Sequence, residues 1–172
     1  MSASRKASEA PDAVDAIIDQ WNSVRPELDV EAMAVFGRIA RITAKLQTVM
    51  DRTYGQFGIN RGEFDVLATL RRADEPYTLS PRQLSATLML TTGGMTGRLD
   101  KLERAGLLAR SPDPNDRRGL QVTLTEKGLA LIEEAVVAGL EVRQAILTSL
   151  DDRETEQLNG LLRTLLAATN QA

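Results

Sequence analysis

Residues 91–128 read TTGGMTGRLDKLERAGLLARSPDPNDRRGLQVTLTEKG, and this stretch decides the fold. It opens on small hydroxyl and glycine residues and then follows helical spacing to Gly106, which predicts a helix. Two short apolar runs then flank a loop of Pro, Asp, Asn and Gly, which predicts a β-hairpin with a long tip. The tip carries Asp116, Arg117 and Arg118.

Another helix is predicted just before this stretch. Ser80 followed by Pro81 favours helix initiation, and Leu84 and Leu88 supply an apolar side. A short break at residues 90–91 leads into the next helix. Helix, turn, helix and hairpin together predict a winged helix-turn-helix, whose second helix can enter the major groove of DNA.

Upstream of this element the sequence predicts further helices. Asp12 is the expected N-cap of a short amphipathic helix with Trp21, the single tryptophan, on its buried side. A longer helix is predicted over residues 29–57, and Asn60 is the expected cap of a helix over residues 59–74.

Downstream, Thr125 and Gly128 begin a helix, and a Leu-rich helix closes the chain after Asp151 and Asp152. Long helices with apolar stripes at both ends of a chain would aggregate unless they pack together, which predicts a twofold dimer. The expected fold is mainly α with a small β-wing. We expect a disordered tail (1–10), N-terminal helices (11–58), a winged helix-turn-helix lobe (59–125) and C-terminal dimerisation helices (126–172).

The composition excludes several classes of protein. The 172 residues include no Cys and no His, so disulfides, thiol chemistry, His-based catalysis and the common zinc sites are excluded. We therefore expect no metal, no cofactor and no enzymatic activity. The polar first ten residues do not resemble a signal peptide, and no apolar run is long enough to span a bilayer, so we expect a cytoplasmic protein without membrane contact.

The net charge of −3 is unevenly distributed. Residues 81–128 hold eight Lys or Arg against five Asp or Glu, a net charge of +3, whereas the rest of the chain has 13 against 19, a net charge of −6. This asymmetry predicts a phosphate-attracting patch on an acidic body.

Three segments resemble conserved blocks of the MarR family of winged-helix transcriptional regulators. They are GEFDVLATLRR at 62–72, TTGGMTGRLDKLERAGLL at 91–108 and DPNDRRGLQVTLTEKG at 113–128, in the order and spacing of the family. The resemblance extends from about residue 29 to the C-terminus. It implies a homodimer that binds double-stranded DNA.

The residues expected to bind DNA follow from the wing and the two helices of the motif. Hydroxyls at the start of the second helix suit base edges or phosphates, although one of them can serve as the helix cap. The wing arginines suit phosphates and a narrow minor groove, and the alternative is a solvated turn. The predicted DNA-binding residues are Thr91, Thr92, Thr96, Arg82, Arg117 and Arg118.

The added N-terminal helix and four side chains resemble the urate-responsive subgroup of the family. The resemblance implies that Trp21, Asp65, Arg98 and Arg110 bind a ligand. From the residues alone, a structural ion pair between Asp65 and Arg98 is the slightly preferred interpretation, and the subgroup resemblance favours the ligand site.

We therefore expect a dimeric repressor that binds pseudo-palindromic double-stranded DNA and is released by a small anionic metabolite such as urate or a related purine or carboxylate. The alternative is an architectural winged-helix protein that binds DNA without responding to a ligand.

Overall fold

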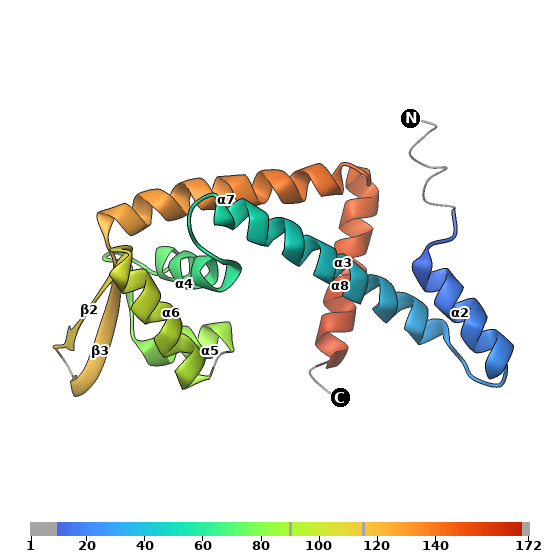
Figure 1. The fold of residues 1–172 in the computed structure, drawn as a ribbon, viewed down its shortest axis with the longest axis horizontal. Helices are drawn as coiled ribbons and strands as arrows, with labels where there is room; N and C mark the ends of the chain where they lie inside the picture. The colour runs from blue at the N-terminus through green and yellow to red at the C-terminus, as the bar shows by residue number, and fades with distance from the viewer. Residues whose placement is uncertain (1–9, 90, 115, 170–172) are drawn as a thin grey trace. The chain divides into compact units, whose positions relative to one another are not determined.

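The computed structural model describes residues 10–89, 91–114 and 116–169 (Figure 1). Most of the expected disordered tail therefore lies outside the described residues. The chain forms two compact units, residues 49–142 and residues 1–48 with 143–172. These units divide inside two long helices, and the domain boundaries expected at 58/59 and 125/126 remain predictions. Within the described residues, no helix is long and apolar enough to cross a membrane.

The architecture is mainly helical with one small sheet, as the sequence predicts. In chain order the elements are α2 (Ala13–Val24), α3 (Glu31–Gly55), α4 (Arg61–Arg71), β1 (Thr78–Leu79), α5 (Pro81–Leu88), α6 (Thr92–Arg104), β2 (Leu108–Asp113), β3 (Asp116–Leu124), α7 (Glu126–Leu147) and α8 (Asp152–Thr169).

Helices α4 and α5 begin at the predicted caps. The Asn60 side chain accepts a hydrogen bond from the backbone N–H of Glu63 at 2.9 Å, and the Ser80 hydroxyl accepts one from Gln83 at 3.2 Å. Pro81 occupies the first turn of α5, where its missing N–H is not needed. These caps satisfy backbone donors that a helix N-terminus leaves unpaired.

The sheet is antiparallel and has the order β1-β3-β2. The hairpin of β2 and β3 confirms the predicted wing. Strand β1 was not predicted, because two residues are too few to show an alternating pattern. It pairs Thr78 with Thr123, and their hydroxyl oxygens lie 2.7 Å apart. The base of the wing is therefore flanked on both sides.

The core of the 49–142 unit is formed by α4, α5, α6, β2 and β3 and by the adjoining ends of α3 and α7. The rings of Tyr54 and Phe64 stack with centroids 3.9 Å apart. The largest fully buried side chains are Met50, Tyr54, Val66, Leu67, Leu70, Leu84, Met95, Leu102, Leu108, Val122 and Ile132.

A junction at the end of α6 joins this helix to the wing and to α7. Gly106 has φ +71°, a conformation that favours glycine and ends the helix. The Thr125 hydroxyl donates to the Gly106 carbonyl oxygen at 2.8 Å and accepts from the Gly128 N–H at 3.0 Å. A Cβ on Gly128 would lie 1.9 Å from the carbonyl oxygen of Leu107. Only glycine therefore permits this approach of backbone to backbone.

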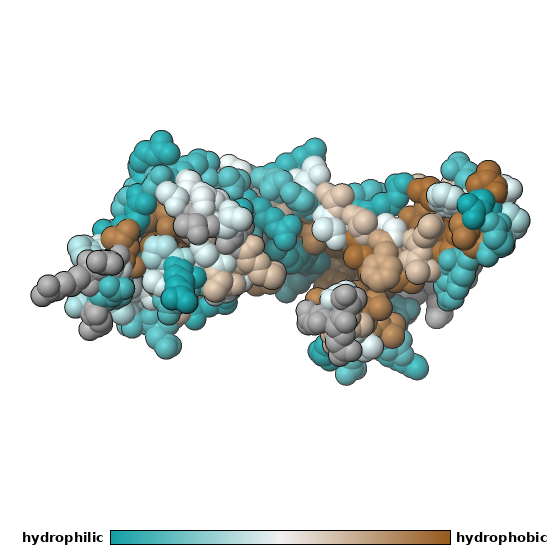
Figure 2. Space-filling view, turned by 90° about the horizontal axis from the view of Figure 1, so that it is seen from below, coloured by the Kyte–Doolittle hydropathy of each residue, from teal (hydrophilic) through white to brown (hydrophobic). Residues whose placement is uncertain are grey.

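The described part of the other unit exposes many apolar side chains. Helix α8 contains no buried residue, and its Leu161 and Leu166 are 66% and 67% exposed. On α3, Phe36 and Ile42 are 51% and 62% exposed. Some of this apolar surface is visible as brown areas in Figure 2. The predicted apolar stripes are thus present, and this chain leaves them uncovered.

Gly128→Ala tests the junction. The added methyl group would overlap a backbone carbonyl that cannot move without shifting the start of β2, so we expect the free energy of unfolding to fall by about 1–3 kcal/mol or more. Urea unfolding at fixed protein concentration measures the change. Gly160→Ala is the control, because a Cβ at Gly160 meets nothing within 4 Å. Equal stability of the two variants would contradict the assignment.

Candidate nucleic-acid interface and ligand site

The turn between α5 and α6 connects the two helices of the helix-turn-helix motif. Met89 ends α5 in the left-handed conformation, with φ +51°, and its side chain is 92% exposed. Leu90 lies outside the described residues. Thr91 then caps α6, because its hydroxyl accepts a hydrogen bond from the Gly94 N–H at 3.3 Å. The capping role considered for Thr91 from the sequence is therefore confirmed.

Helix α6 has a buried apolar side and an exposed side of small residues. Met95, Leu99 and Leu102 are 1–2% exposed and face the core. Thr91, Gly93, Gly94, Thr96 and Gly97 are exposed. Glycine and threonine have small side chains, so another molecule, such as a DNA duplex, can approach the backbone of α6 closely on this side. The side chain of Thr92 lies outside the described part of the structure.

The wing, which is formed by β2 and β3, follows α6 in the chain. Strand β2 pairs with β3 from Leu108 opposite Leu124 to Pro112 opposite Leu120, and the register shifts between Pro112 and Asp113. A Cβ on Gly119 would lie 3.0 Å from the Asp113 Cβ, so this position of the narrow hairpin suits glycine.

The structure places the predicted cationic residues as follows. The backbones of Arg117 and Arg118 belong to β3, and their side chains lie outside the described part of the structure. Arg82, the second residue of α5, is exposed and forms no ion pair with a described residue. The assignment of these three arginines to DNA remains a prediction.

Arg110 on β2 is held by two carboxylates of α6. Its guanidinium lies 2.7 Å from the Asp100 carboxylate and 2.5 Å from that of Glu103, and its backbone N–H donates to Glu103 at 3.0 Å. The hydrogen bond from Arg110 holds the pKa of Glu103 below its usual value. The bonds to Glu103 and then Asp100 raise the pKa of Arg110. This cluster ties the wing to the second helix.

Asp65 and Arg98 do not form an ion pair in the structure. Both are half-buried, Asp65 on α4 and Arg98 on α6. Arg98 Nη1 instead donates to the carbonyl oxygen of Gly62 at 3.4 Å. Neither side chain has an ion-pair partner among the described residues. The structural salt bridge considered from the sequence is therefore absent here, whereas both groups belong to helices that pack together.

Trp21 belongs to the other compact unit and is not buried, contrary to the prediction. Its side chain is 38% exposed, beside Ile17 at 39% and Val24 at 68%. The periodicity correctly located an apolar face, but α3 covers only part of it. Val14 is the residue that is buried, at 3% exposed, and a Cβ on Gly37 would lie 3.2 Å from its Cγ1.

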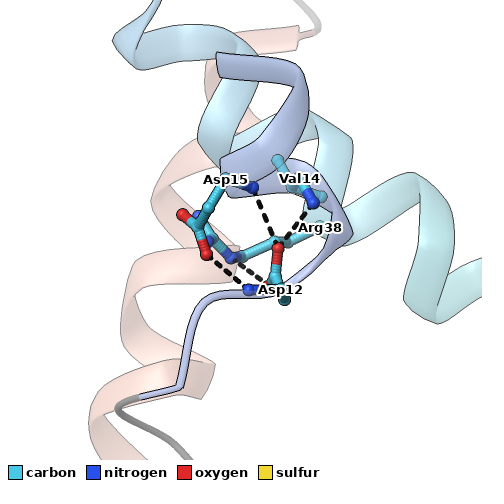
Figure 3. A network of polar contacts seen from close by, with 4 residues as sticks. All are labelled: Asp12, Val14, Asp15 and Arg38. Carbon is cyan, nitrogen blue, oxygen red and sulfur yellow. Dashed lines mark hydrogen bonds and ion pairs between the residues drawn. The ribbon is translucent and has the colours of Figure 1, made fainter. Parts of the chain in front are cut away.

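The helix that carries Trp21 is attached at its start by a polar cluster (Figure 3). Arg38 of α3 donates to the carboxylates of Asp12 at 2.9 Å and Asp15 at 2.6 Å. Asp12 also accepts from the Val14 N–H, which is the main reason that its pKa lies below the usual range. The predicted cap at Asp12 is therefore confirmed, and it also anchors α2 to α3.

Comparison with known proteins identifies the family. The sequence model described as the MarR family matches residues 57–119. The HTH-type transcriptional regulator PecS of Dickeya dadantii (strain 3937) is 40% identical over 149 residues, which cover 87% of this chain and 90% of PecS. The chain belongs to the MarR family. It is therefore a DNA-binding winged-helix transcriptional regulator, as the resemblance of its three sequence segments implied.

Solved structures of MarR family members agree with this fold. The C80S mutant of MarR from E. coli, complexed with operator DNA, has a TM-score of 0.68 at 28% identity, covering 85% of this chain and 97% of that one. AbsC, a MarR family regulator from Streptomyces coelicolor, has a TM-score of 0.74 at 19% identity, covering 84% and 98%. At 19% identity, the similarity to AbsC shows the fold alone.

Sequence reasoning missed three residues of this MarR family lobe. Asp100 and Glu103 hold Arg110, and Gly62 contacts Arg98. Asp100 and Glu103 are three residues apart on one helix face, and this spacing was the sequence signal that could have found them. Gly62 gave no signal, because its role depends on a helix 36 residues further along the chain. Among the described residues, no group of three His, Cys, Asp or Glu could hold a metal ion.

Glu103→Gln tests the cluster at Arg110. A carboxyl group whose folded pKa is depressed contributes stability above its unfolded pKa, and this contribution is lost as pH falls through the folded pKa. We expect the free energy of unfolding to decline more steeply for the wild type than for Glu103→Gln between about pH 5 and pH 3. Urea unfolding across this range measures both slopes. Glu156→Gln, an exposed change on α8, should follow the wild type. Parallel curves for Glu103→Gln and the wild type would contradict the role of the pair.

Proposed function

We propose that the protein is a homodimeric repressor that binds pseudo-palindromic double-stranded DNA and is released by a small anionic ligand such as urate or a related purine or carboxylate. The observation that carries the DNA-binding part is the two-sided helix α6. Its buried side is fixed by Met95, Leu99 and Leu102, so its exposed side of threonine and glycine is presented rigidly beside the wing.

The mode of DNA binding follows from the side chains that the lobe offers. Thr91 and Thr96 place hydroxyls and methyl groups near base edges or phosphates, with Thr92 beside them. Arg82 on α5 and the wing arginines supply positive charge to the backbone and the minor groove. The exposed first half of α6 carries glycine and threonine in place of long polar side chains, so we propose that DNA shape supplies much of the discrimination between sequences.

The dimer is supported by the uncovered apolar surfaces of α3 and α8. Leu161, Leu166 and Ile42 are each more than 60% exposed in the single chain, and monomeric proteins rarely leave such faces open. A twofold dimer would bury them and present two copies of α6. For binding to one side of the duplex, the two helices must match half-sites about 34–36 Å apart.

The ligand site is proposed around Asp65, Arg98, Arg110 and Trp21. Arg98 has no carboxylate partner among the described residues, so it is available to an anion, and Asp65 is available to a ligand N–H. Arg110 would complete the site by exchanging one of its two carboxylates for the ligand, and Trp21 is included on the subgroup resemblance alone. Support comes from the subgroup resemblance and from the absence of an Asp65–Arg98 ion pair.

The release mechanism follows from the position of Arg98 on α6. A ligand that binds Arg98 acts on the helix that reads DNA, and it favours the conformation of the dimer whose helix spacing mismatches the half-sites. The size of this population shift equals the difference in ligand affinity between the two conformations. An architectural DNA-binding protein would show no such response.

Arg118→Ala tests the wing. Loss of one minor-groove or phosphate contact should weaken operator binding and reduce the slope of log K against log salt by about one. Mobility shifts or fluorescence anisotropy on DNA upstream of its own gene, at several salt concentrations, measure both quantities. Arg25→Ala is the control, because Arg25 is exposed and paired with Glu27 in the loop after α2. An unchanged affinity and slope in Arg118→Ala would remove the wing from the interface.

Asp65→Asn and Arg98→Ala test the ligand site. We expect each variant to form a folded dimer that binds DNA but is no longer released by urate, because each change removes a charged ligand contact. A mobility-shift titration with urate measures release, and size-exclusion chromatography checks the dimer. Asp51→Asn, an exposed change on α3, should respond like the wild type. Normal release in both site variants would refute the site, and a wild type that ignores urate and related purines would favour the architectural alternative.

A further inference from the structure

The guanidinium of Arg98 contacts the backbone of α4 at Gly62. A side chain at position 62 would occupy the space that the guanidinium fills. A Cβ built on Gly62 would lie 2.6 Å from Arg98 Cζ and 2.9 Å from both Nε and Nη1. Real Cβ atoms do not approach other heavy atoms so closely. The guanidinium therefore lies directly on the backbone of Gly62, whose carbonyl oxygen accepts a hydrogen bond from Nη1 at 3.4 Å.

The first turn of α4, which bears this contact, is itself held firmly. Glu63 is buried, caps the helix together with Asn60, and forms an ion pair with Lys101 of α6 at 2.7 Å. Lys101 follows Arg98 by three residues, so both side chains leave the same side of α6. Arg98 and Lys101 thus contact adjacent residues of α4, and the Gly62 backbone is a fixed support for the guanidinium.

This contact directs the Arg98 guanidinium to the backbone of α4 and not to a carboxylate. Asp65 follows Gly62 by three residues and lies one turn further along α4. Arg98 and Asp65 are on helices that pack together and are both half-buried, yet they form no ion pair. A guanidinium displaced from Gly62 can pair with the Asp65 carboxylate, which forms no ion pair with a described residue, whereas Glu63 is already paired with Lys101.

We propose that Gly62 is a positioning residue of the ligand site, which holds the Arg98 guanidinium away from Asp65 and leaves both charged groups open to the ligand. This inference rests on the proposed function of Arg98 and Asp65. A side chain at position 62 would expel the guanidinium. Arg98 would then close on Asp65, and the ligand would have to break that ion pair before binding.

Gly62→Ala tests the proposal. The group that must move is the flexible end of Arg98, so the fold should tolerate the change, and Ala is the better helix former. We expect unchanged or raised thermal stability, unchanged operator affinity, and an increase of about tenfold or more in the urate concentration needed for release, the scale of a charged hydrogen bond. Gly55→Ala, where a Cβ meets nothing within 4 Å, should respond to urate like the wild type.

One further measurement separates positioning from a general structural effect. The Nε–H resonance of Arg98, assigned with Arg98→Lys, should shift between the wild type and Gly62→Ala without any ligand. An unshifted resonance, a normal urate response or a loss of stability in Gly62→Ala would overturn the proposal. A wild type that does not respond to urate would refute the proposed function, and the Nε–H resonance would still decide whether Gly62 positions Arg98.

Discussion

The structure of the winged lobe depends on the contact between Gly128 and the carbonyl oxygen of Leu107. At this junction α6 has just ended, β2 begins, and α7 starts after β3 has returned. Lys127 adds a bond from its ammonium group to the Ala105 carbonyl oxygen at 2.9 Å, which is also favoured by the negative end of the helix dipole. Four elements therefore share one fixed point, and α6 cannot shift at its end without moving the wing and α7.

Helix α6 is held along the rest of its length by three kinds of contact. Apolar side chains face the core, Arg98 and Lys101 contact α4, and Asp100 and Glu103 hold Arg110 of the wing. The remaining side carries threonine and glycine towards solvent. Charge and packing thus occupy the other sides of the helix and leave the threonine and glycine side free. Because Arg98 belongs to this helix, a displacement of its side chain acts on a contact that holds α6 against α4.

Local signals in the sequence predicted most of the fold, and long-range contacts account for what it missed. Caps at Asp12, Asn60 and Ser80 depend on residues three positions apart, so they could be read directly. Strand β1 exists only through pairing with β3, 45 residues away at Thr78 and Thr123. The exposure of Trp21 depends on how much of α2 is covered by α3, which no periodicity reveals. The family resemblance suggested the candidate ligand-binding residues, but the contact of Arg98 with Gly62 joins two helices 36 residues apart in the sequence, which no local pattern reveals.

The short strand β1 has a mechanical consequence for the wing. Near its end β3 is bonded to a strand on each side, with Thr78 and Leu79 opposite Thr123 and Val122. Towards the tip, β2 is the one strand that pairs with it among the described residues. In the hairpin, β3 is therefore held by strand pairing on both edges at the base and on one edge beyond it. The outer part of the hairpin therefore resists bending less than its base, where β3 is bonded on both edges. The tip can adjust its position without a change in the junction of α6, β2 and α7.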